Sequence, residues 1–148
     1  MRAFLKLLGF YFFGFLLCLS VLTLPGCALF QKSLTADQLV IQELTAAGIQ
    51  AGCTTQACYD ARAAHVAALA TTLKSVTPGM AVTDVTALLQ KALTSLKLTP
   101  EETAPLTAFV SGIGTYLVNK YGSGALAQSA ITDIQTIAGW IAAEAALY

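Results

Sequence analysis

The sequence predicts an all-α protein: a small bundle of four or five helices that follows a hydrophobic N-terminal leader. Three observations support this class. After position 34, apolar residues recur at intervals of three and four, helix start and stop signals separate five such stretches, and the alternation typical of β-strands is almost absent. The connections between the stretches are short, so helices that follow one another are expected to run antiparallel.

The first 26 residues have the layout of a cleavable signal peptide. Arg2 and Lys6 precede an uncharged, largely apolar run from position 7 to 24, and Pro25-Gly26 breaks this run. The alternative is an uncleaved membrane helix, because about 18 apolar residues can just cross a bilayer.

At the end of the leader, Leu24-Pro25-Gly26-Cys27 resembles the lipobox of bacterial lipoproteins. The resemblance implies cleavage before Cys27, a diacylglycerol group on its sulfur and a fatty acid such as palmitate on the new amino group. Several acyl chains hold a protein on a membrane essentially permanently, so Cys27 would be a lipid anchor. We therefore expect a signal peptide at 1–26, a lipidated tether at 27–34 and a helical domain at 35–148.

The residue after the lipidated cysteine acts as a sorting signal in Gram-negative lipoproteins, and here it is Ala28 rather than Asp. The resemblance implies the outer membrane, with the domain facing the periplasm. In a Gram-positive cell, the same signal would place the protein on the outer face of the plasma membrane.

Length and charge restrict the remaining possibilities. Removing 26 of the 148 residues leaves 122, enough for one domain with a real core. Only 11% of the residues are charged, and the basic residues beyond the leader occur singly, so nucleic-acid binding is disfavoured. These basic residues are expected on the solvated surface: Lys32, Arg62, Lys74, Lys91, Lys97 and Lys120.

Two cysteines remain when Cys18 is removed with the leader and Cys27 is lipidated. Cys53 and Cys58 are separated by four residues at the predicted start of the second helix, and exported thiol pairs usually oxidise. A structural disulfide is the favoured interpretation, and free thiols are the alternative. Redox or metal chemistry is disfavoured, because a redox pair normally has two intervening residues and a zinc site needs further ligands.

Start and stop signals place the first three helices. The first is expected from Thr35, whose Thr35-Ala36-Asp37-Gln38 sequence has the form of a capping box, to Ala47 before Gly48. The second is expected from Thr54 or Thr55 to Ser75, before Thr77-Pro78-Gly79. The third is expected over 81–97.

A stretch without charge from Thr103 to Asn119 supplies the fourth helix. Pro105 lacks an amide donor, so a short turn at 99–104 and a new helix over 105–120 are expected. Apolar residues cover most of this helix, which favours a buried central position. Gly112 with Ala108 would permit close packing of another helix, and a second membrane-inserting segment is the alternative interpretation. The last helix is expected over 125–146, after the stop at 121–124.

Groups that could perform catalysis are few. Asp60 lies five residues before His65, which puts the two on different helix faces, so His65 is expected to be a surface or packing residue. Glu101 and Glu102 follow Thr99-Pro100 and have the pattern of a helix start rather than of a catalytic carboxylate pair. We therefore expect no enzyme, no metal and no cofactor.

Three function classes follow from this pattern. The leading one is a structural or protein-interaction lipoprotein of the cell envelope that binds another envelope protein or a second copy through an exposed apolar patch. The second is a helical binder of an apolar ligand or lipid, and the third, a cell-wall hydrolase, is least favoured. A phage-type lipoprotein that protects the host envelope is compatible with the first class.

Overall fold

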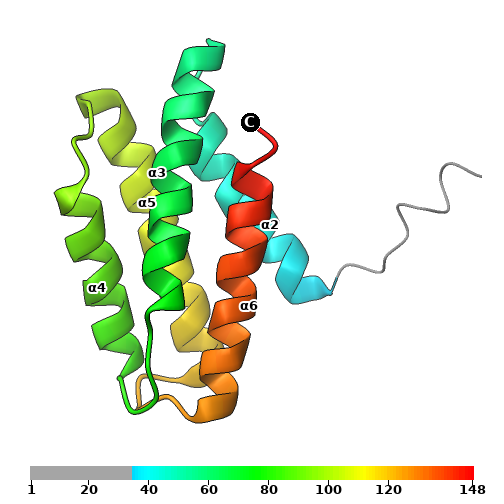
Figure 1. Ribbon diagram of the computed structural model, residues 1–148, viewed down its shortest axis with the longest axis vertical. Coiled ribbons are helices and arrows are strands. Elements are labelled where there is room, and N and C mark those ends of the chain that lie inside the picture. Colours follow the sequence, from blue (N-terminus) through cyan, green and yellow to red (C-terminus); the bar gives the residue numbers. More distant parts are fainter. Residues whose placement is uncertain (1–34) are drawn as a thin grey trace, which may run out of the picture. The chain divides into compact units, whose positions relative to one another are not determined.

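The computed structural model describes residues 35–148, and these form five α-helices (Figure 1). The predicted all-α bundle of four to five helices is thereby confirmed. The leader and Cys27 lie outside the described residues. The helix bounds are Ala36–Gln50 for α2, Gln56–Lys74 for α3, Val82–Ser95 for α4, Pro100–Tyr121 for α5 and Gln128–Ala145 for α6.

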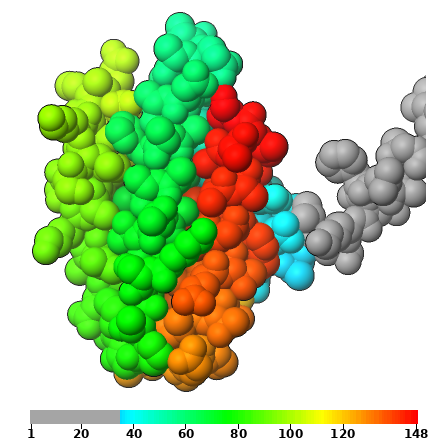
Figure 2. Space-filling model, in the orientation of Figure 1, coloured from blue at the N-terminus to red at the C-terminus, as the bar shows by residue number. Residues whose placement is uncertain are grey.

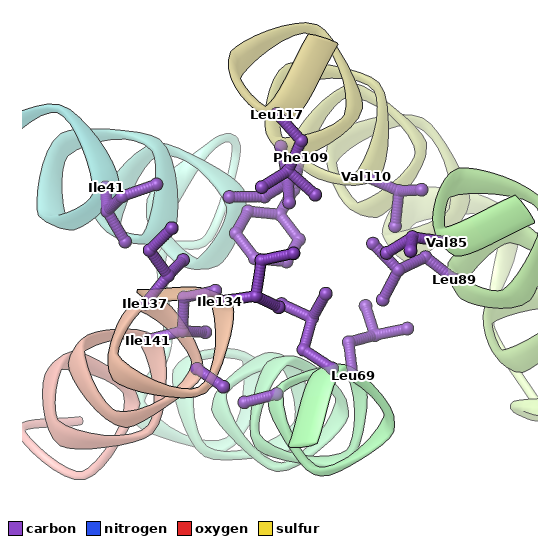
Figure 3. Packing of buried hydrophobic residues seen from close by; sticks show 14 of the residues in the cluster. Ile41, Leu69, Val85, Leu89, Phe109, Val110, Leu117, Ile134, Ile137 and Ile141 are labelled. Carbon is purple, nitrogen blue, oxygen red and sulfur yellow. The ribbon is translucent and has the colours of Figure 1, made fainter. Parts of the chain in front are cut away.

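The five helices form a closed ring around one apolar core. In order around the ring, α2 contacts α5, α5 contacts α4, α4 contacts α3, α3 contacts α6, and α6 contacts α2. In addition, α2 contacts α3 directly. Figure 3 looks into this ring, where side chains from all five helices converge, among them Ile41, Leu69, Leu89, Phe109 and Ile137. The prediction that the fourth helix is buried at the centre is wrong, because α5 is a ring member with one exposed face.

Local capping fixes several helix starts. The hydroxyl of Thr35 accepts a hydrogen bond of 3.2 Å from the Gln38 amide, and Thr55 accepts one of 3.3 Å from the Cys58 amide. At α4, the Asp84 carboxylate accepts from the Ala81 amide at 3.3 Å. These side chains satisfy amides that have no partner within the helix, which is why the predicted starts of α2, α3 and α4 are correct to within two residues.

The predicted break before Pro105 is wrong, because α5 runs without interruption from Pro100 to Tyr121. Pro105 removes the amide that would bond to the Glu101 carbonyl four residues earlier. Arg62 of α3 supplies another donor: its Nη2 lies 2.9 Å from the Glu101 oxygen. A tertiary contact therefore satisfies the carbonyl that the local sequence leaves without a partner.

Two glycines lie where helices pack closely. Gly48 does not end α2, which continues to Gln50. A Cβ added at Gly48 would lie 3.0 Å from Cβ of Phe109, and one at Gly112 would lie 2.9 Å from Cδ2 of Leu44. The close approach predicted at Gly112 is confirmed, with α2 as the partner helix.

The last helix starts three residues later than expected. Residues 125–127 run alongside the loop before α4 instead: Ala81 and Ala125 form an antiparallel bridge, and the Leu126 amide donates to the Met80 carbonyl at 2.8 Å. Leu126 itself is buried. This pairing fixes the two loops at one end of the bundle to each other.

Candidate functional site

A groove lies between α4 and α5. The two helices approach closely because Gly114 is buried between them, and a Cβ there would lie 3.0 Å from Cγ2 of Thr86. Small side chains beside this contact leave a groove of about 450 Å³. The residues that line this α4/α5 groove are Thr83, Thr86, Ala87, Gln90, Ser111, Gly114, Thr115 and Val118.

The lining of the α4/α5 groove contains no ionisable group. Thr86 donates its hydroxyl to the Val82 carbonyl of its own helix at 3.1 Å, so this hydroxyl is already satisfied. Val118, which is 41% exposed, adds a large aliphatic surface. Such a lining can cover an apolar or weakly polar partner, but it offers no acid, base or charged nucleophile.

A second cluster centres on Arg62, which is only 2% exposed. The prediction that this residue is a solvated surface group is wrong. Its Nη1 donates to the carbonyls of Ile49, at 3.4 Å, and of Ala51, at the end of α2, while Nη2 donates to Glu101 of α5. Among the described residues, its Nε has no hydrogen-bond partner. Arg62 is buried because it caps backbone carbonyls of two other helices, and the charge is thereby solvated by dipoles.

Glu102 and His65 lie beside Arg62. The Nε2 atom of His65 is 3.7 Å from Oε1 of Glu102, and Oε2 of Glu102 accepts hydrogen bonds from the Thr99 amide at 2.8 Å and the Thr99 hydroxyl at 3.0 Å. The Thr99 amide bond, together with the Thr99 hydroxyl and the charges of His65 and Arg62, holds the pKa of Glu102 below its usual value despite burial. The carboxylate thus caps the start of α5, as the sequence predicts for this residue.

Sequence reasoning missed the proximity of these three groups. Glu102 is distant in the chain from Arg62 and His65, and no local motif connects them. One signal was present: Arg62 falls at helical spacing between the apolar residues Tyr59 and Val66, both of which pack in or against the core. A basic residue on a buried stripe is a candidate for carbonyl capping.

The disulfide between Cys53 and Cys58 is present, with a Cα–Cα distance of 5.6 Å. It joins the loop after α2 to the first turn of α3, as the favoured interpretation predicts. The hydroxyl of Tyr59 donates to the Cys53 carbonyl at 2.9 Å. Tyr148 packs against the same end: Gln56 donates to its carbonyl at 2.7 Å, and the rings of Tyr59 and Tyr148 have centroids 6.1 Å apart.

An ion pair joins α2 to α5 near the opposite end of α2. Nζ of Lys120 lies 2.5 Å from Oδ2 of Asp37 and 3.3 Å from the hydroxyl of Tyr116. The hydrogen bond between Lys120 and Asp37 lowers the pKa of the Asp37 carboxyl group and raises the pKa of the Lys120 amine. The first turn of α2 is therefore attached to α5 through a neutralised pair.

Residues 35–148 lack two further features. None of the five helices is long and apolar enough to cross a membrane. Within the same residues, no group of three or more His, Cys, Asp or Glu side chains is arranged to hold a metal ion.

Comparison with known proteins gives no relative. No protein-family model, curated protein or solved structure matches the chain.

Proposed function

We propose that the protein is a lipid-anchored lipoprotein of a bacterial cell envelope that binds another envelope protein, or a second copy of itself, through the α4/α5 groove. The basic and apolar leader and the Leu24-Pro25-Gly26-Cys27 motif support the anchor. The proposed location is the periplasmic face of the outer membrane, or the outer face of the plasma membrane in a Gram-positive source.

The uncharged lining of the α4/α5 groove is the observation that carries the binding role. Protein interfaces have cores depleted in charged residues, because a buried charge must lose its water without full compensation. A partner can cover Thr86, Gly114 and Val118 without removing any charge of this chain from water. The aliphatic surface of Val118 gives such a contact an apolar centre.

The anchor is tested with a Cys27→Ser variant of the full chain. We expect wild-type protein to incorporate labelled palmitate and to have a mass that begins at a lipid-modified Cys27, whereas the variant incorporates no label. A wild-type product that retains its leader, or whose Cys27 sulfur is free, contradicts the proposal.

The groove is tested with Ala87→Arg and Thr115→Arg, which place a charge in the lining. The matched control is Ala68→Arg, at an exposed position on α3 outside the groove. Crosslinking in intact envelopes identifies the partner, and co-purification of two differently tagged copies detects self-association. We expect the groove variants to lose roughly ten-fold in complex, about 1.4 kcal/mol, while the control binds like wild type. Equal binding by all three variants contradicts the groove as the contact site.

A small apolar ligand is the second candidate occupant of the same groove. Its volume of about 450 Å³ lies within the range of ligand pockets, and its lining contains Ala87, Gly114 and Val118. Mass spectrometry of lipid extracted from the natively purified full chain tests this candidate. A stoichiometric lipid that is lost with Thr115→Arg favours it, and its absence excludes tight binding.

A further inference from the structure

The exposed face of α2 carries two large aliphatic side chains. Six residues of α2 are exposed, of which four are apolar and one is charged: Ala36, Leu39, Val40, Glu43, Ala47 and Gln50. Leu39 is 46% exposed and Val40 is 43% exposed. We call these six residues the α2 outer face.

Large apolar side chains are rare on the rest of the described surface. Among residues 35–148, the exposed large hydrophobic residues are Leu39, Val40, Val118 and Leu147, so two of the four lie in the first two turns of α2. On α6, by contrast, the exposed residues are Gln, Ser, Thr, Asp and a single Ala. Neighbouring exposed aliphatic groups of this kind mark a contact surface rather than an ordinary solvated face.

Charge near the α2 outer face is low. Asp37, which lies beside it in the first turn, is paired with Lys120 at 2.5 Å. Glu43 is the one charged residue on the face itself. The face can therefore approach a second apolar or interfacial surface at little electrostatic cost.

The chain that precedes α2 indicates which surface this is. Seven residues separate Cys27 from Thr35, the N-cap of α2, and they span at most about 24 Å. The 15-residue helix is itself about 22 Å long. A lipid group on Cys27 would thus keep the whole α2 outer face within about two helix lengths of a bilayer, at a high effective concentration.

We infer that the α2 outer face rests on the bilayer surface into which the lipid on Cys27 inserts, with Leu39 and Val40 at the level of the lipid headgroups. This inference rests on the proposed lipid anchor. It also leaves the α4 side of the α4/α5 groove free, because α4 packs against α5 and α3 and makes no extensive contact with α2. Figure 2 shows the side formed by α3, α4 and α6, with α2 only at its edge.

Tryptophan fluorescence in vesicles tests the inference, because the chain has one tryptophan, Trp140 on α6. In a Trp140→Phe background, Leu39→Trp and Val40→Trp report on the α2 outer face. Ala68→Trp, on the exposed side of α3, is the matched control. The full acylated chain is reconstituted in phosphatidylethanolamine–phosphatidylglycerol vesicles whose acyl chains carry bromine close to the headgroup.

We expect bromine to reduce emission roughly two-fold for Leu39→Trp and Val40→Trp, and to leave Ala68→Trp unchanged. Trp140 packs against the core, so if its replacement prevents folding, the same probes are measured as differences from the natural background. Vesicle flotation separates the two proposals. A chain that does not float overturns the anchor and the inference together. If the chain floats but bromine reduces the emission of all three probes equally, the inference alone is overturned. The same holds if the chain floats and two copies contact each other through α2 instead.

Discussion

Arg62 donates a hydrogen bond of 2.9 Å from Nη2 to the carbonyl oxygen of Glu101, the carbonyl whose usual helical donor is missing because residue 105 is proline. The guanidinium of one helix thus replaces an amide of another. This contact allows α5 to begin at Pro100, and it connects α3 to α5 while Nη1 reaches the end of α2.

Arg62→Met is expected to lower the free energy of unfolding by about 3 kcal/mol, because three carbonyls lose their donor in a buried setting. Chemical denaturation of the full chain measures this change. Pro105→Ala restores the missing amide, so the effect of Arg62→Met should be about 1 kcal/mol smaller in that background. If the two substitutions are additive, Arg62 does not compensate for the proline.

Glu102→Gln is expected to weaken the acid dependence of stability. The bonds from Thr99 lower the pKa of Glu102 in the folded protein, so its carboxylate stabilises the fold above the pKa of the unfolded chain. This contribution is lost as the pH falls through the lowered pKa of the folded protein. At pH 7 the variant should lose about 1 kcal/mol through the weakened cap. Unfolding curves recorded from neutral pH down to below pH 4 measure the effect.

Glu101→Gln is the control for that experiment, since Glu101 is exposed and adjacent in sequence. It leaves the bonds between Glu102 and Thr99 in place, so its pH profile is the reference for Glu102→Gln. A profile for Glu102→Gln that follows wild type would show that the Thr99 bonds do not shift the titration of this carboxylate.

Replacing both Cys53 and Cys58 by serine is expected to cost about 2 kcal/mol, because the disulfide closes only a short loop. Thermal unfolding with and without reductant gives the measurement. Reductant should lower the midpoint of the wild-type chain and have no effect on the double serine variant. Two alkylatable thiols in the native, non-reduced protein would contradict the bridge.

Three glycine-to-alanine substitutions should separate close packing from helix propensity. Gly139→Ala meets nothing within 4 Å and should stabilise the fold by up to about 1 kcal/mol. Gly48→Ala would press on Cβ of Phe109, which cannot move without its backbone, and should destabilise by about 1–3 kcal/mol. The added methyl group of Gly112→Ala meets only the end of the Leu44 side chain. Its effect on the free energy of unfolding should therefore lie between those of the other two substitutions. A different order in unfolding experiments would indicate that the α2–α5 spacing can adjust.

Local signals in the sequence were sufficient for most of the secondary structure. Periodicity and capping residues predicted α3 and α4 to within two residues at each end, apart from Ala81 as a cap without a side-chain acceptor. They failed where a distant contact overrode the local preference. Pro105 is tolerated because of Arg62, Gly48 is helical because Phe109 packs on it, and α6 starts late because Leu126 pairs with Met80.

The candidate surfaces could be predicted only in part. The low charge of the stretch from Thr103 to Asn119 is visible in the sequence, but a groove exists only when Thr86 and Gly114 of two helices meet. The burial of Arg62 and the proximity of His65 to Glu102 depend on the ring order of the helices, which no local pattern encodes.

The position of α2 in the ring also affects the order in which the chain can fold. Among the described helices, α2 packs against α3, which follows it directly, and against α5 and α6, the last two that a ribosome makes, so the burial of Ile41 and Ile49 is completed only when synthesis is almost finished. The described fold therefore closes around its first helix only when its last helix is in place, which makes folding depend on contacts between distant parts of the chain.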